Sequence, residues 1–142
     1  MEQAFNDTRS IVRQVPRHFT FCEPFWEGTR ARKLLIQYCP DSGKYQFYPR
    51  PASIFTGKRN LEWREVSGRG ELFSWTVAHI VRPPFVGHTP FVVATVTLDE
   101  GVNIIADLVN VTLEQLAIGL RVKPAWAPLE DGTNVLLFEP ED

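Results

Sequence analysis

Apolar and polar residues alternate along the second half of the chain. After the glycines of 68–70 this alternation predicts a long strand over 73–81, because successive side chains of a strand point to opposite faces. Two more strands are expected at 91–98 and 102–109, joined by a tight turn at 99–101. One face of the first strand is expected to carry Phe73, Trp75, Val77, His79 and Val81.

A short helix is predicted after the third strand. Thr112 and Gln115 have the spacing of a capping box, and Gly119 suits the left-handed residue that ends a helix. Strands at 120–127 and 134–138 complete the order β-β-β-α-β-β. This is the order of the OB-fold, a five-stranded, partly open barrel, although another five-stranded half-barrel also fits the pattern.

The beginning of the chain lacks a strand pattern. Residues 1–20 carry scattered apolar positions and several arginines, and we expect a docking arm that is ordered by a partner and does not join the core. Pro24 suits the first turn of a helix, which places Phe25 and Trp26 together on one side. We predict that both rings are partly exposed in the isolated chain or buried in a homodimer.

A small module is predicted between the helix and the barrel. The apolar run 34–39 is typical of a strand, and the stretch 39–58 is rich in turn formers with aromatic residues between them. The chain is therefore expected to be mainly β, with an arm and short helix at 1–33, a ribbon at 34–66 and the five-stranded barrel at 67–142.

The net charge of −2 hides an uneven distribution along the chain. The first 70 residues hold 12 Lys and Arg against 7 Asp and Glu, whereas the remaining residues hold 3 against 10. This asymmetry favours an anionic ligand or partner on the basic half, while chance combined with internal ion pairing explains it equally well.

The composition, 44% hydrophobic and 23% charged, is that of a globular protein. No apolar run exceeds about five residues, against the roughly 18 that a membrane span needs, and the first residues lack the apolar core of a signal peptide. We therefore expect a cytoplasmic protein that does not enter a membrane. Its two cysteines, Cys22 and Cys39, are too few for a disulfide framework, so reduced thiols are expected.

Catalytic sequence motifs are missing from this chain. It has no nucleophile elbow, no phosphate-binding loop and no His-Glu-x-x-His metal motif. Of its three histidines, His79 falls in a predicted strand, where a hydrogen-bonded core histidine is more common than a catalytic one. His88 lies in the long loop 82–90, where it either lines a cleft or is merely exposed, and His18 stands alone.

Several short motifs follow one another in a distinctive order over roughly residues 20–140. They are Phe25-Trp26, Leu34 to Cys39, Tyr48-Pro49-Arg50, Gly70 with Ser74-Trp75-Thr76, Pro90 to Ala94, Gly101-Val102, Ile118 to Val122 and Phe138-Glu139-Pro140. Together they resemble the DUF35 family. The resemblance implies N-terminal helices, a rubredoxin-like zinc ribbon and a C-terminal OB-fold. It also implies a non-catalytic subunit that binds acyl-CoA or assembles with thiolase-like or hydratase-like acyl-CoA enzymes.

One departure from the family pattern concerns the metal. The family's ribbon resembles Cys-x2-Cys, a gap of about ten residues and a second Cys-x2-Cys, which is a zinc-ligand spacing. That spacing falls here on Cys39, Ser42, Ser53 and Thr56. Zinc needs thiolates or neutral imidazoles, so we predict that no zinc binds. We expect packing of aromatic residues to replace the metal, with Cys39 an inert remnant or, less favoured, a reactive nucleophile. These aromatic residues are Tyr38, Tyr45, Phe47, Tyr48 and Phe55.

Charge also decides which ligands the expected barrel suits. Its acidity makes nucleic acid an unlikely ligand, because tracking a phosphate backbone needs a row of Lys and Arg. One CoA needs only a few cations for its phosphates and an apolar platform for its adenine. The candidates near the junction of ribbon and barrel, which solvated surface charge also explains, are Arg50, Lys58, Arg59, Arg64 and Arg69, with Arg82 on the long loop.

The leading hypothesis is a non-catalytic accessory or acyl-CoA-binding subunit that assembles with a thiolase-like or hydratase-like acyl-CoA enzyme. Arg50, Arg64, Arg69 and Arg82 are its predicted ligand-binding residues, and no residue is predicted to be catalytic or to bind metal. The first alternative is an OB-fold protein that binds nucleic acid. The second is a small acyl-CoA enzyme in its own right, such as a thioesterase or hydratase.

Overall fold

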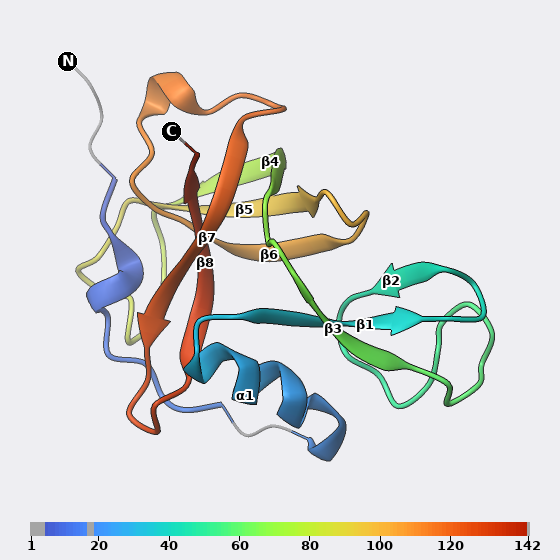
Figure 1. Ribbon diagram of the computed structural model, residues 1–142. Helices are drawn as coiled ribbons and strands as arrows, with labels where there is room; N and C mark the ends of the chain where they lie inside the picture. The colour runs from blue at the N-terminus through green and yellow to red at the C-terminus, as the bar shows by residue number, and fades with distance from the viewer. Residues whose placement is uncertain (1–4, 17–18, 142) are drawn as a thin grey trace.

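A computed structural model describes residues 5–16 and 19–141. They form one α-helix, a small three-stranded sheet and a closed five-stranded barrel (Figure 1). In chain order the elements are the 3-10 turns Thr8–Ser10 and Thr20–Cys22, helix α1 (Glu23–Arg30), strands β1 (Leu34–Cys39), β2 (Lys44–Gln46), β3 (Glu62–Val66), β4 (Gly70–Ala78), β5 (Phe91–Leu98) and β6 (Asn103–Leu108), the 3-10 turn Leu113–Gln115, and strands β7 (Arg121–Pro128) and β8 (Asn134–Pro140).

The barrel has the strand order β4-β5-β6-β8-β7 and closes where β7 meets β4. Neighbouring strands are antiparallel except β6 and β8, which run parallel at Leu108 and Phe138. The side chains of Leu72, Val96 and Phe138 fill its interior and are fully buried. The predicted OB-fold is therefore confirmed. The predicted capping box is also present, since Thr112 and Gln115 bond to each other's backbone around a single 3-10 turn.

The first barrel strand differs from the alternation that the sequence predicts. Leu72 is buried, but Phe73 and Trp75 are 57% and 37% exposed. A β-bulge between Leu72 and Ser74 leaves Phe73 without a partner on β5. After the bulge, Trp75 and Val77 pair with the buried Ala94 and Val92, so they lie on the same face as Leu72, and the predicted alternation is wrong for Phe73. The expectation of a buried core histidine was wrong: His79 lies beyond the end of β4 and is exposed.

The ribbon is the sheet β2-β1-β3, and it extends from the barrel as a separate lobe (Figure 1). Its outer end is filled by polar side chains. Gln46 Nε2 donates to Gln37 Oε1 at 2.8 Å, and both side chains are buried. The expected aromatic interior was wrong for Tyr48 and Phe55, which are 47% and 41% exposed. Two amides, each with donors and an acceptor, satisfy the loop backbone in a way that aromatic rings do not.

The base of the ribbon belongs to the barrel's core. Leu34, Ile36 and Val66 are buried in the same apolar cluster as the barrel residues Leu72 and Phe138. This shared cluster fixes the ribbon against the barrel at the point where the chain passes from one to the other.

The N-terminal arm packs on its own barrel. Thr8 and Ile11 are buried, and Thr8 Oγ1 donates to Asp107 Oδ2 at 2.7 Å. Arg13 forms an ion pair with the same carboxylate at 3.3 Å. The expectation that this arm stays outside the core until a partner orders it was therefore wrong for 5–16, because Asp107 on β6 supplies a partner within the chain.

Helix α1 is fixed to the barrel at its C-terminal end. Asn134 donates through its backbone N–H to Thr29 Oγ1 at 3.0 Å and through Nδ2 to Thr29 O at 2.7 Å. On the side facing β1, Gly28 packs closely against the side chain of Leu35, which would have to move to admit a larger residue at this position. Within the described ranges no helix is long and apolar enough to cross a membrane.

Candidate functional site

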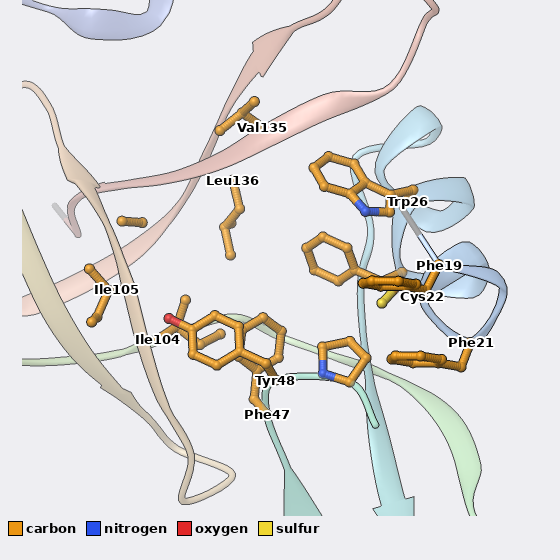
Figure 2. A pocket seen from close by; sticks show the side chains of 13 residues that line it. Phe19, Phe21, Cys22, Trp26, Phe47, Tyr48, Ile104, Ile105, Val135 and Leu136 are labelled. Carbon is orange, nitrogen blue, oxygen red and sulfur yellow. The ribbon is translucent and has the colours of Figure 1, made fainter. Parts of the chain in front are cut away.

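An apolar pocket of about 430 Å³ lies where the helix, the ribbon and the barrel meet. Figure 2 shows its side chains pointing into one space from these three parts of the chain. It is lined by Phe19, Phe21, Cys22, Phe25, Trp26, Phe47, Tyr48, Pro49, Ile104, Ile105, Ala106, Val135 and Leu136.

Aromatic rings form the walls of the pocket. Phe19 and Phe21 are stacked, with ring centroids 5.4 Å apart. Phe25 contacts Trp26 edge to face at 5.2 Å, and it also contacts Phe47 of the ribbon at 5.8 Å. The contact between Phe25 and Phe47 joins the helix side of the wall to the ribbon side, and the half-burial of Phe25 and Trp26 agrees with their predicted partial exposure.

The floor and the mouth of the pocket differ in exposure. Ile104 on β6 and Leu136 on β8 are buried and form the floor. Phe19 and Ile105 are 70% and 61% exposed and lie at the mouth. A ligand entering from solvent therefore meets exposed apolar side chains first and a closed barrel surface at the bottom.

The chemistry of the lining is that of a binding surface. Among the described residues that line it, none carries a charged side chain, and the only polar side-chain groups are the Cys22 thiol, the Tyr48 hydroxyl and the Trp26 indole N–H. Burial raises the pKa of the Cys22 thiol, so at neutral pH it stays protonated and weakly nucleophilic. The pocket suits an apolar or aromatic group, which it can hold without reacting with it.

Two of the four predicted ligand-binding arginines lie in the ribbon, in different settings. Arg50 follows the lining residue Pro49, and its backbone is held by Gln37, which donates to Arg50 O at 2.7 Å and accepts from Arg50 N at 2.8 Å. Among the described residues its guanidinium has no ion-pair partner. Arg64 instead lies 3.6 Å above the Tyr38 ring and pairs with Glu62 at 2.8 Å on the surface of the ribbon.

The other two predicted arginines lie on the barrel side. Arg69 pairs with Glu141 at 3.1 Å, next to the start of β4. Arg82 is exposed in the loop between β4 and β5. The structure thus brings none of the four side chains into the pocket lining, and only Arg50 directly adjoins it in sequence.

The positions with zinc-ligand spacing do form a turn-rich cluster. Cys39 is buried, and Ser53 Oγ donates to its Sγ at 3.1 Å. The Ser42 and Ser53 hydroxyls beside the thiol lower the pKa of Cys39. Ser53 Oγ also accepts from the backbone N–H groups of Phe55 and Thr56. One thiol and three hydroxyls do not fit zinc, and the described residues hold no cluster of three or more His, Cys, Asp and Glu for a metal ion.

Sequence reasoning missed most of the pocket. Ile104, Ile105 and Leu136 follow ordinary strand patterns, and nothing in the sequence distinguishes them from other barrel residues. A signal was present at 19–26, where four of eight residues are aromatic although no strand pattern explains them. That density identifies an apolar surface but not the barrel strands that face it.

Comparison with known proteins gives relatives of two kinds. The family described as "ChsH2, C-terminal OB-fold domain" matches residues 63–127. The 3-oxo-4,17-pregnadiene-20-carboxyl-CoA hydratase alpha subunit of Mycobacterium tuberculosis is 34% identical over 83% of this chain, which spans only 37% of that subunit. In a solved structure, the Ltp2-ChsH2(DUF35) aldolase, one chain superposes with a TM-score of 0.78 at 28% identity, covering 89% of this chain and 98% of the other.

A shorter relative matches along most of its length. The DUF35 domain-containing scaffold protein of Pyrococcus furiosus is 30% identical over 99 residues, which make up 70% of this chain and 73% of the relative. This likeness agrees with the barrel and with the small sheet before it. The chain belongs to the DUF35 family.

Proposed function

We propose that this chain is a non-catalytic subunit that assembles with a thiolase-like or hydratase-like acyl-CoA enzyme and holds the acyl part of its substrate. Three relatives support assembly: one is named a scaffold protein, one is named the alpha subunit of a CoA-ester hydratase, and one is a chain of the solved Ltp2-ChsH2(DUF35) aldolase. The observation that supports binding of the acyl group is the pocket of about 430 Å³ with its aromatic walls.

The size and the polarity of the pocket favour the acyl group over the CoA nucleotide. Its volume lies within the range of about 300–1,000 Å³ typical of small-molecule sites. The CoA phosphates need cations, which the described lining lacks. An apolar acyl chain or ring system needs only burial, and each buried CH₂ contributes about 0.8 kcal/mol.

Arg50 is the cation best placed for the phosphates of the same ligand. The ribbon amide Gln37 holds its backbone beside Pro49, so the position of residue 50 relative to the pocket is fixed. Its guanidinium has no ion-pair partner among the described residues. Arg64 and Arg69 pair with Glu62 and Glu141, and we propose them, together with Arg82, only as secondary contacts.

The ligand is tested by titrating the chain with CoA and with acyl-CoA esters of increasing apolar size, from acetyl to octanoyl. Trp26 fluorescence and calorimetry report binding, because this indole lines the pocket. Since octanoyl exceeds acetyl by six methylenes, we expect at least a hundredfold tighter binding of octanoyl-CoA than of acetyl-CoA. Equal affinity for CoA and octanoyl-CoA would exclude an acyl site in this pocket.

A matched pair of variants locates the site. Ile105 at the mouth and Ile118 outside the lining are both exposed, so aspartate at either position leaves the core intact. Ile105→Asp is expected to weaken octanoyl-CoA binding at least tenfold, and Ile118→Asp to leave it unchanged. Arg50→Ala is expected to weaken binding of CoA and its esters by a common factor of about tenfold, which corresponds to one charge-assisted contact.

Assembly is tested separately by purifying the tagged chain from its source cells and identifying the bound proteins by mass spectrometry. The expected result is a stoichiometric enzyme with thiolase-like or hydratase-like catalytic residues. A chain that elutes alone at physiological salt would contradict the subunit role, whatever the result of the acyl-CoA titration.

A further inference from the structure

The loop between β2 and β3 carries exposed apolar side chains at the end of the ribbon that points away from the barrel (Figure 1). Ile54 is 57% exposed and Phe55 is 41% exposed, and neither side chain lines the pocket. Scattered apolar residues are common on protein surfaces and need no explanation by themselves. What distinguishes this pair is the way its loop is held and the charge around it.

Polar groups hold this loop in one conformation. Gln46 Oε1 accepts from the backbone N–H of Ile54 at 2.9 Å, and Ser53 Oγ accepts from that of Phe55 at 3.1 Å. The backbone closes the turn, because Ser53 N donates to Lys58 O at 2.8 Å. Gln46 and Ser53 are themselves buried. A partner that contacts the two exposed apolar side chains therefore does not have to order the loop when it binds.

Positive charge surrounds the apolar pair. The described stretch 40–60 holds four cations, Lys44, Arg50, Lys58 and Arg59, against one carboxylate, Asp41. The Lys44 ammonium lies 5.2 Å from the centroid of the Phe55 ring. Lys58 and Arg59 are exposed, and neither has an ion-pair partner in the part of the chain that the structure describes. Asp41 accepts from Asn60 Nδ2 at 3.2 Å and is the only carboxylate in this stretch to offset them.

Neighbouring elements do not reverse this charge. The two carboxylates of β3 are paired, Glu62 with Arg64 at 2.8 Å and Glu65 with Lys33 at 4.0 Å. Helix α1 and the acidic barrel lie toward the other end of the ribbon (Figure 1). The surface around the loop 53–60 is therefore cationic.

An apolar centre with cations around it favours an acidic protein surface as the occupant. Protein interfaces combine a buried apolar core with a charged rim of complementary sign. A second copy of this chain, docked loop to loop, would bring like charges together. A nucleic acid needs a longer row of cations along its backbone than this loop carries.

We propose that the loop 53–60, together with Lys44, binds an acidic surface of the partner enzyme whose carboxylates surround an apolar spot. This proposal rests on the proposed subunit function and specifies a surface through which the subunit binds. Ile54 and Phe55 supply the apolar contact, and the three cations beside them supply the charge complementarity. In this role the polar network inside the ribbon keeps the binding loop in shape.

Zero-length cross-linking tests the contact directly in the complex with the co-purified acyl-CoA enzyme. A carbodiimide joins a lysine amine to a carboxylate only when the two lie at ion-pair distance. We expect Lys44 or Lys58 to be joined to an Asp or Glu of the enzyme. The affinity of the complex should also fall as the salt concentration rises, because salt screens exposed charges.

Two matched pairs of variants separate the loop from general surface effects. Arg59→Glu is expected to weaken the complex at least tenfold, whereas Arg32→Glu makes the same change at an exposed arginine just after α1 and should leave the affinity unchanged. Ile54→Ala should weaken the complex about fivefold, whereas Ile80→Ala, at a residue 96% exposed beyond β4, should have no effect. All four side chains are exposed, so each variant should keep the melting temperature of the wild type.

The outcomes distinguish this proposal from the function on which it rests. A complex that Arg59→Glu and Ile54→Ala weaken no more than their controls do would overturn the loop proposal and leave the subunit function intact. An unchanged complex with weaker octanoyl-CoA binding by the free Arg59→Glu chain would overturn it in favour of the CoA phosphates. An unchanged complex with oligonucleotide binding that Arg59→Glu abolishes would overturn it in favour of nucleic acid. Failure of any enzyme to co-purify would overturn the subunit function and this proposal together.

Discussion

The ribbon and the barrel are both small, mainly antiparallel sheets, yet different kinds of side chain fill their interiors. The barrel encloses aliphatic and aromatic side chains such as Leu72 and Phe138, which are fully buried. The outer end of the ribbon encloses the amides of Gln37 and Gln46, with Ser53 and Cys39 beside them. A closed barrel holds enough apolar volume to be stable by burial, whereas a short ribbon needs a metal or a complete hydrogen-bond network.

Truncating a buried side chain of the barrel core should lower the free energy of unfolding more than any other change proposed here. Phe138→Ala removes a fully buried ring at the parallel junction of β6 and β8, and we expect it to lower the free energy of unfolding by about 3–5 kcal/mol. Urea denaturation measures the change. Phe73→Ala, which truncates an exposed ring, serves as the control and should change stability by less than about 0.5 kcal/mol. Equal effects of the two variants would show that the barrel is not stabilised by its apolar interior.

A substitution in the ribbon network should have a smaller and more local effect. Gln46→Met keeps the volume but removes the bonds to Gln37 Oε1, Ala52 O and the backbone N–H of Ile54. We expect a loss of about 1–3 kcal/mol, because buried backbone groups lose their partners. Hydrogen exchange should quicken mainly within 44–58. Exposed Gln14→Met is the control, and equal loss of protection in the barrel strands would contradict a local network.

Acid should weaken the contact between helix α1 and the barrel slightly. The Thr133 side chain and backbone donate to Asp131 and lower its pKa, and Arg30 of α1 donates to Asp131 O. The pKa of Asp131 therefore lies lower in the folded chain than in the unfolded chain, and the ionised carboxylate stabilises the fold. This stabilisation is complete above about pH 4 and is lost as the pH falls through the lowered pKa. Melting temperatures of wild type and Asp131→Asn should differ by a few degrees at most at pH 6 and converge near pH 2. A difference that stays constant across this range would show that the Asp131 carboxylate is not responsible.

Removing metal should have no effect at all. Protein purified without added metal is expected to contain far less than one zinc per chain, and a chelator should not change its melting temperature, because hydroxyls occupy three of the four ligand positions. A triple variant with cysteine at positions 42, 53 and 56 is the positive control and should bind zinc. Stoichiometric zinc in the wild-type chain would contradict the hydrogen-bonded ribbon.

Much of the barrel was predictable because its signals are local. The turn at 99–101, the capping box at Thr112 and the two final strands each depend on neighbouring residues. The bulge after Leu72 was not predictable from the sequence, because it is visible only in how β4 pairs with β5. The same holds for the arm, whose packing depends on an aspartate 99 residues away from Thr8.

The candidate site was predictable only in its general position. Charge and fold led us to expect a ligand near the junction of ribbon and barrel, and the pocket that we propose as its site is lined by residues of both and of the helix. Its lining combines four stretches of chain, around Phe25, Phe47, Ile105 and Leu136, that meet only after folding. The abundance of arginine in the first half of the chain led us to predict a cationic site, whereas aromatic and aliphatic side chains line the pocket.

The apolar cluster shared by Leu34, Ile36 and Val66 with the barrel has a consequence for how such proteins diversify. Separating the ribbon from the barrel would expose buried side chains of both parts to solvent. We therefore expect the barrel to be inherited together with the base of its ribbon. The buried residues of the outer tip, such as Gln37 and Gln46, are not part of this shared cluster. Evolution can therefore exchange metal ligands for hydrogen-bonding side chains at the tip, while the base, which packs in the barrel's core, stays under selection for shape.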